Sequence, residues 1–197
     1  AVGEDNVYVA TDDRRIGDEV EKYGYKVIYT SESCLTGTDR VAEASLEIDA
    51  EVIVNVQGDE ALLNPNDIIK AVECKVNNTN HVVTCMAKLT SSEKPTNLKT
   101  CKVVTNLDGD LMYVSRNAIP SSKNGIIKSA YKQVCVYAFD KEQLKEYYDV
   151  GKKDGKTPVE SSEDIEIIRF LEMGIKVKMV EVEGGTLAVD YPEDVKM

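Results

Sequence analysis

The sequence predicts an α/β fold in which a mostly parallel sheet carries helices on both faces, together with a small β-rich part. Short apolar runs alternate with amphipathic segments through residues 6–78, as they do in β–α–β units. Between residues 81 and 139, strand-like runs follow one another with little helix between them. No internal repeat or linker divides the chain, so we expect residues 1–197 to form one domain, with about 101–139 as its β-rich subregion.

The first half of the chain is predicted to form three strand–helix units. Apolar residues recur at helical spacing before Gly24, a residue suited to ending a helix. Asn64 followed by Pro65 is a favourable start for another helix. The expected strands are 6–12, 25–30 and 51–57, and the expected helices are 13–24, 39–48 and 64–78.

The second half is predicted to be richer in strands. The segment LDGD at 107–110 is typical of a hairpin turn between two of them. Residues 151–157 are rich in Gly and Lys and are expected to form a loop. The expected strands are 81–89, 101–106, 110–116, 132–139 and 175–182, and the expected helices are 140–150 and 160–173.

Composition excludes several classes of function. The formal net charge is −11, so the overall field opposes binding to nucleic acid or to an anionic membrane surface. No apolar stretch approaches the roughly 20 residues that cross a bilayer. Five scattered cysteines and a single histidine, His81, argue against a zinc site, a disulfide framework and a histidine-based hydrolase. The odd number of cysteines suits a reducing compartment, and we expect a cytoplasmic protein.

Acidic residues gather where three predicted strands end. Asp12 and Asp13 follow one strand, Gln57–Glu60 follow another, and Asp190 follows the apolar run GTLAV. In open α/β sheets, ligands bind outside the carboxyl ends of the strands. Adjacent acids are costly without a counter-charge, which Mg²⁺ would supply. Residue type alone favours solvated loop acids or helix caps over a metal site, and both interpretations remain open at this point.

Two arginines are further candidates for binding groups. In TGTDR (36–40), backbone N–H groups at a helix start could receive an anion while Arg40 binds a carbonyl, carboxylate or phosphate. Alternatively, Thr38 or Asp39 caps the helix and Arg40 lies in water. Arg116, which follows a strand in YVSRNAIP, is either an acid-binding group or a surface residue.

The order of the motifs resembles the 3-deoxy-manno-octulosonate cytidylyltransferases, also called CMP-Kdo synthetases. The resemblance covers essentially the whole chain, and TGTDR and VNVQGDE are its most specific parts. It implies a nucleotide-diphospho-sugar transferase-like (Rossmann-like) fold and a Mg²⁺-dependent reaction. CTP would give its cytidylyl group to the anomeric hydroxyl of an acid sugar, releasing pyrophosphate. The motifs, in order, are VYVATDD, TGTDRVAEA, VIVNVQGDE, YVSRNAIP, KQVCVYAF, VESSEDIEIIRFLEMGIKVK and VDYPEDV.

The resemblance also assigns roles to individual residues. Asp59 and Asp190 match the family's metal ligands, so two separate loops would have to meet across one crevice. Arg40 and Gln57 match positions that line the nucleotide and sugar site. Arg116, Tyr137 and Glu166 match positions near the acid sugar. Gln133 occupies another position that is expected to contact the sugar. The family resemblance further implies a cytoplasmic homodimer that supplies an activated sugar for cell-surface polysaccharide such as lipopolysaccharide or capsule.

The sequence departs from the family pattern at three points. Gln133 stands where the family usually has His, and Ile167 stands where it has Gln. Unpaired polar groups in a buried site cost about 1–3 kcal/mol each. These changes would therefore weaken binding of the usual sugar, whose hydroxyls would lose hydrogen-bond partners. The acceptor could therefore be an amino-sugar acid, another modified acid or a phosphonate. Nothing before NVYVATDD resembles the family's first strand and phosphate-binding loop, so we expect little activity from residues 1–197 alone.

Two other functions compete with this one. The first keeps the fold but uses another nucleotide or a hexose 1-phosphate, which TGTDR and VNVQGDE oppose. The second is a catalytically degenerate binding or assembly module. The missing loop favours that module, whereas the intact Asp59 and Asp190 oppose it.

Overall fold

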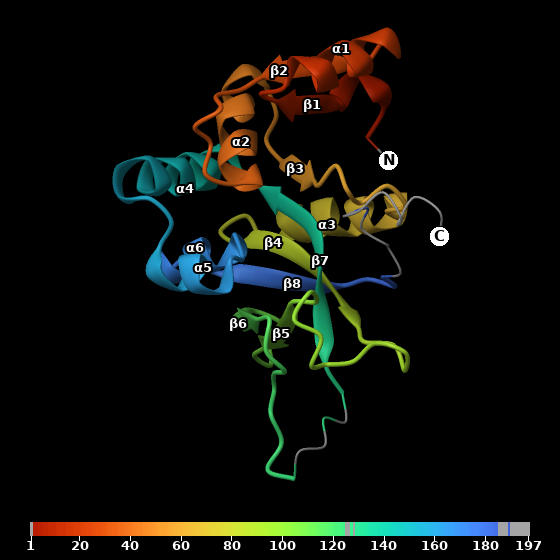
Figure 1. Ribbon diagram of the computed structural model, residues 1–197, viewed down its shortest axis with the longest axis vertical. Helices are drawn as coiled ribbons and strands as arrows, with labels where there is room; N and C mark the ends of the chain where they lie inside the picture. The colour runs from red at the N-terminus through yellow and green to blue at the C-terminus, as the bar shows by residue number, and fades with distance from the viewer. Residues whose placement is uncertain (1, 125–126, 128, 185–188, 190–197) are drawn as a thin grey trace.

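Strand β7 (Tyr131–Phe139) lies at the centre of the main sheet and pairs with three other strands. In this computed structural model, which describes residues 2–124, 127, 129–184 and 189, it runs through the middle of the molecule (Figure 1). All three of its partners are antiparallel to it: β3 (Ile53–Val56), β4 (Val82–Lys88) and β5 (Lys102–Thr105). The register between β4 and β7 shifts at Thr84/Cys85, which marks a β-bulge.

The sheet is completed on either side of these strands. The C-terminal strand β8 (Val177–Glu181) runs parallel to β4, and β6 (Leu111–Ser115) pairs antiparallel with β5. A separate parallel pair, β1 (Tyr8–Thr11) and β2 (Lys26–Tyr29), lies with α1 (Arg14–Lys22) at one end of the molecule. Strands β5 and β6 lie toward the opposite end (Figure 1).

The predicted α/β fold is confirmed, with one correction to the sheet. Among the described strands only β1·β2 and β4·β8 are parallel, and the other four pairings are antiparallel. The main sheet is therefore mixed rather than mostly parallel. The cause is β7, which returns from the β-rich part and runs against each of its neighbours.

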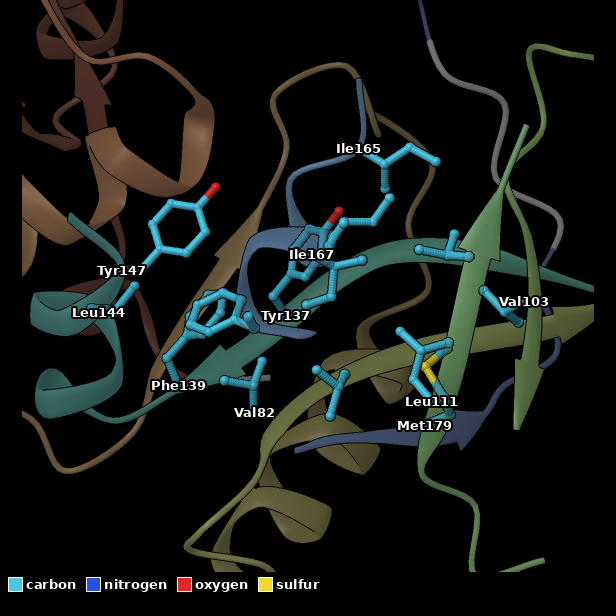
Figure 2. Close-up of a cluster of buried hydrophobic side chains, with 14 of the residues drawn as sticks. Val82, Val103, Leu111, Tyr137, Phe139, Leu144, Tyr147, Ile165, Ile167 and Met179 are labelled. Atoms are coloured by element: carbon cyan, nitrogen blue, oxygen red, sulfur yellow. The ribbon is translucent and has the colours of Figure 1, made fainter. Parts of the chain in front are cut away.

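Helices cover both faces of the main sheet, as expected. On one face, α2 (Gly37–Ala44), α4 (Lys141–Asp154) and α6 (Ile167–Glu172) contribute side chains to a core cluster with β4 and β7. Figure 2 shows Leu144 and Tyr147 of α4 near Phe139 and Tyr137 of β7. On the other face, α3 (Pro65–Asn77) packs Ala71 against Val83 and other strand residues.

The helix boundaries differ from the predictions in three places. Helix α2 begins at Gly37, with Thr36 as its N-cap, and leads into a 3-10 turn at Ser45–Glu47. Helix α4 extends into the predicted loop 151–157 and ends at Asp154. The predicted helix 160–173 is two short helices, α5 (Pro158–Glu163) and α6, because Asp164 between them adopts a left-handed backbone with φ of 53°.

Two further observations agree with the sequence. Asn64 caps α3 ahead of Pro65, and Gly24 has a positive φ just beyond α1. A 3-10 turn at Glu4–Asn6 precedes β1. None of the helices in the described part of the chain is long and apolar enough to span a membrane.

Candidate functional site

The loop Gln57–Glu60 leaves the main sheet beside β7. Val56 of β3 pairs with Val136, so the loop begins next to Cys135. Asp59 Oδ1 and Glu60 Oε2 are both buried, and neither has a hydrogen-bond partner among the residues that the structure describes. The backbone of the loop is held in place, because Asp59 O accepts hydrogen bonds from the N–H groups of Ala61 (3.0 Å) and Val189 (2.9 Å).

These unpartnered oxygens fit a divalent cation. A buried carboxylate oxygen without a partner is costly, and Mg²⁺ prefers carboxylate oxygens. The described residues contain no group of three or more Asp, Glu, His or Cys side chains that could hold a metal by itself. Asp190, the predicted partner of Asp59, lies outside the described residues. Its role stays a prediction, as does that of Asp59.

The Cys135 thiol beside this loop stays protonated. Burial, and then the charges of Glu60 and Asp59, raise the pKa of the Cys135 thiol to about 12. Cys135 is therefore a neutral thiol packed against the core and not a nucleophile, as the sequence indicated. All five cysteines are free.

Tyr137 and Gln133 lie on β7 near the same loop. Gln133 Nε2 donates a hydrogen bond to Tyr137 Oη at 3.2 Å. Tyr137 is 3% exposed, and burial raises the pKa of its hydroxyl well above the ordinary value. It therefore remains a neutral donor and acceptor at physiological pH. Ile167 is 1% exposed and belongs to the core cluster (Figure 2).

Arg40 joins α2 to the carboxyl ends of β1 and β2. Its Nη1 donates to Thr30 Oγ1 at 2.6 Å, and its Nη2 lies 3.2 Å from Asp12 Oδ2. The interpretation of Arg40 as a residue in water is wrong, because its side chain is only 21% exposed. It lies instead at the strand ends, where a ligand was expected.

The N-terminus of α2 holds an anion, and that anion is the carboxylate of Glu166. Glu166 Oε1 accepts from the backbone N–H of Gly37 at 3.0 Å. Its Oε2 accepts from the N–H of Thr38 at 2.9 Å and from the Thr38 hydroxyl at 2.5 Å. The TGTDR loop does bind a negative group, but that group comes from α6's own N-cap residue, Glu166. Neither Thr38 nor Asp39 is the N-cap, because Thr36 takes that position.

Arg116 is held by the turn between α5 and α6. Its Nε donates to the backbone carbonyl of Glu163 at 2.6 Å and its Nη2 to that of Asp164 at 2.9 Å. The Glu163 carboxylate in turn accepts from the backbone N–H of Arg116 at 3.0 Å. Arg116 is thus a partly buried, fully engaged side chain and not a free surface residue.

Arg169 is a buried charged residue that the sequence analysis missed. Its Nη1 lies 2.7 Å from Asp39 Oδ1, and its Nη2 lies 2.7 Å from Glu160 Oε1. Asp39, Glu160 and Arg169 are all at most 2% exposed. Burial by itself lowers the pKa of Arg169, but hydrogen bonds with Glu160 and Asp39 raise it above its ordinary value. An arginine among apolar residues in VESSEDIEIIRFLEMG was the available signal for this network.

Hydrogen bonds and strand register therefore bring the site residues into two groups. One group lies at the end of β3 and on β7, and comprises Gln57, Asp59, Gln133 and Tyr137. The other lies around α2 and the α5–α6 turn, and comprises Arg40, Arg116 and Glu166.

Comparison with known proteins identifies the family. A family model described as cytidylyltransferase matches residues 1–179. A 3-deoxy-manno-octulosonate cytidylyltransferase of Protochlamydia amoebophila is 37% identical, over 96% of this chain and 75% of that protein. The chain belongs to the 3-deoxy-manno-octulosonate cytidylyltransferase family. A second member, from Christiangramia forsetii, is 35% identical over 98% of this chain and 77% of its own length.

The structural comparison agrees with membership of this cytidylyltransferase family. A CMP:2-keto-3-deoxy-manno-octonic acid synthetase, solved in complex with CTP, has a TM-score of 0.87 and 30% identity. The match covers 97% of this chain and 78% of that one. An inositol-1-phosphate CTP transferase from T. maritima is 18% identical, with a TM-score of 0.60 over 93% of this chain and 69% of its own, and shares the fold alone.

Proposed function

We propose that this protein transfers CMP from CTP to the anomeric hydroxyl of 3-deoxy-manno-octulosonate or a close relative, with release of pyrophosphate. CTP-dependent cytidylyl transfer follows from the family to which the chain belongs. The observation that carries the proposal in this chain is Asp59 Oδ1 after the carboxyl end of β3, which is buried and has no partner within the described part of the chain. A catalytically degenerate module would have no reason to keep an uncompensated carboxylate there.

The proposed reaction is an in-line displacement at the α-phosphorus of CTP. The anomeric oxygen forms a bond to that phosphorus, the bond to the bridging oxygen of the β-phosphate breaks, and the hydroxyl proton leaves to solvent. Asp59 and Asp190 would hold Mg²⁺, which neutralises phosphate charge and lowers the pKa of the attacking hydroxyl when it is bound. Arg40 and Gln57 would bind the nucleotide.

The acid sugar is proposed to bind near Tyr137 and Gln133. The neutral Tyr137 hydroxyl and the Gln133 amide form one hydrogen-bonded unit that can face an acceptor hydroxyl. Arg116 and Glu166 already have partners within the chain, so we propose that they shape the acceptor subsite by holding the α5–α6 turn and α2.

Two residues bear on the choice of acceptor. Ile167 is buried in the core and offers no polar group, and Gln133 differs from histidine in both charge and shape. An acceptor panel should contain 3-deoxy-manno-octulosonate, its amino analogue and a phosphonate. The same assay with the other nucleoside triphosphates tests the preference for cytosine.

We also propose a cytoplasmic homodimer formed through the β-rich subregion. Large apolar side chains are exposed there, with Met112 of β6 64% exposed and Leu107 fully exposed. Sedimentation analysis of Met112→Glu tests this proposal. A wild-type dimer that becomes a monomer supports it, and a monomeric wild type contradicts it.

The central test is pyrophosphate release by the complete, purified protein with CTP and the acceptor panel. Asp59→Asn should abolish release and weaken Mn²⁺ binding, measured by electron paramagnetic resonance, with an unchanged circular dichroism spectrum. Asp49→Asn, at an exposed acid outside the site, is the matched control and should behave like wild type. No release from wild type with any acceptor would favour the assembly module.

A further inference from the structure

The segment Glu160–Arg169, here called the clamp segment, contacts both α2, which carries Arg40, and the end of β6, which is followed by Arg116. On one side it holds the first turn of α2. Glu166 accepts hydrogen bonds from Gly37 and Thr38, and Arg169 pairs with Asp39. Asp39 and Arg40 are consecutive, so the residues that fix α2 lie directly beside the proposed nucleotide-binding arginine.

On its other side the clamp segment holds the end of β6. Glu163 accepts hydrogen bonds from the Ser115 hydroxyl at 2.7 Å and from the backbone N–H of Arg116 at 3.0 Å. Arg116 returns two hydrogen bonds to backbone carbonyls of Glu163 and Asp164. One turn of chain therefore contacts the proposed acceptor-side arginine as well as α2.

The α2 contact is a rigid one. The guanidinium group of Arg169 lies between two carboxylates at 2.7 Å each, and its carbon lies 3.8 Å from the centre of the Tyr147 ring. All of these side chains are buried. Such a fork fixes both distance and orientation, which the single ammonium group of lysine cannot do.

From α2 the connection continues to the ends of β1 and β2. Arg40 is part of α2, and its guanidinium donates to Thr30 and pairs with Asp12 at the strand ends. Because the contact between the clamp segment and α2 is rigid, a ligand that shifts the clamp segment would also shift α2 and Arg40. A second ligand that binds Arg40 better in the shifted position would then bind more tightly.

We infer that the clamp segment couples the two substrate subsites, with Arg169 as its positioning residue, so that the acid sugar and CTP tighten each other's binding. The inference rests on the proposed function, because it requires that both substrates bind to this chain. Coupling between two binding sites is reciprocal and typically amounts to about 5- to 150-fold in affinity.

The test measures binding of a non-hydrolysable α,β-methylene analogue of CTP by calorimetry, with and without a saturating acid sugar. For wild type we expect the dissociation constant to fall about fivefold or more when the sugar is present. In Arg169→Lys the ratio should approach one, while the affinity for each ligand alone changes less. Arg15→Lys, at an exposed Arg–Asp pair, is the matched control and should keep the wild-type ratio.

A folding defect is separated from loss of coupling by circular dichroism and thermal unfolding of each variant. If Arg169→Lys does not fold, Glu163→Ala tests the same inference from the β6 side, since it removes the acceptors of the Arg116 N–H and the Ser115 hydroxyl. A wild type that turns over CTP but binds the analogue equally with and without sugar overturns the inference alone. Coupling that survives in the folded variant overturns it too, because it would then arise from direct contact between the ligands. Absence of turnover and of binding in wild type overturns the proposed function together with the inference.

Discussion

Gly151 of α4 lies directly against the guanidinium group of Arg169 in α6. A Cβ atom at position 151 would overlap Arg169 Nη1 and come within 2.9 Å of Asp39 Oδ1. The missing side chain therefore makes room for the buried ion pair between α6 and α2. Glycine is costly inside a helix, so its presence here has a packing cause.

Gly151→Ala is expected to destabilise the fold, although alanine favours helix in general. The added methyl group must displace a buried guanidinium, and overpacking of this kind costs about 1–3 kcal/mol. The free energy of unfolding in urea measures the effect. Lys153→Ala, at an exposed position of the same helix, should change it by less than about 0.5 kcal/mol. An equal effect of the two substitutions would contradict the packing explanation.

Lys75→Met should be strongly destabilising. Lys75 is 2% exposed, and its Nζ donates to the backbone carbonyls of Thr79 (2.6 Å) and His81 (2.9 Å). It also donates to Asp140 Oδ2 and Gln143 Oε1, both at 3.0 Å. Methionine fills similar space but leaves the two carbonyls and Asp140 Oδ2 without this donor, at a cost of about 3 kcal/mol; Gln143 Oε1 still accepts from the Asp140 N–H.

Urea denaturation measures that cost, with Lys145→Met as the control. Lys145 pairs with Asp149 at the surface, where the pair contributes little. Equal stability of Lys75→Met and wild type would show that the other three acceptors find donors too.

The pair between Asp110 and Lys178 should make stability depend on pH in acid. A hydrogen bond from Lys178 holds the pKa of Asp110 below its ordinary value of 3.8. The unfolded chain therefore binds this proton at a higher pH than the folded chain does. The stabilisation is complete above the unfolded pKa and is lost as the pH falls through the folded one.

Asp110→Asn should accordingly be less stable than wild type at pH 7, by about 1–2 kcal/mol. The difference should shrink as the pH is lowered below about 4. His81 also lies 3.6 Å from Asp110, but burial lowers its pKa, so it is mainly neutral at pH 7. Asp108→Asn, at the exposed neighbouring acid, is the control. A difference that stays constant from pH 7 to pH 3 would refute the assignment.

Gln133→Ala should weaken binding of the acid sugar selectively. It removes the amide that donates to the Tyr137 hydroxyl, so this hydroxyl loses its fixed orientation. One lost hydrogen bond in a buried site corresponds to about a tenfold rise in KM for the acceptor, with KM for CTP unchanged. Steady-state kinetics of this variant and of Lys88→Ala, an exposed strand residue, provide the comparison. A rise in KM for CTP alone would assign Gln133 to the nucleotide.

Local signals in the sequence predicted the strands and most helices, but not the break at Asp164. Neither glycine nor proline occurs between Val159 and Met173 to mark a break, and Asp tolerates a left-handed backbone with little local penalty. The break is imposed by tertiary contacts, since it lets Glu166 reach α2 and Arg116 reach the carbonyls of Glu163 and Asp164.

In the candidate site, too, features of a short motif were predictable, whereas contacts between residues far apart in the sequence were not. An anion at the start of α2 was predictable from TGTDR, because helix N-termini attract negative groups. That the anion would be Glu166 was not, because 129 residues separate it from Gly37. Similarly, the acids after β3 were visible in VNVQGDE, whereas their burial beside Cys135 depends on pairing between β3 and β7.

Strand β7 connects two parts of the molecule, because it pairs with β3 near the proposed metal-binding loop and with β5 in the β-rich subregion. Side chains alternate between the two faces of a strand, so inserting or deleting one residue between Gln133 and Tyr137 would turn these two side chains to opposite faces of the sheet. Point substitutions carry no such penalty. If β7 lines the acceptor subsite as proposed, preference for a new acceptor is accessible by exchanging side chains along β7 and is closed to changes of a single residue in its length.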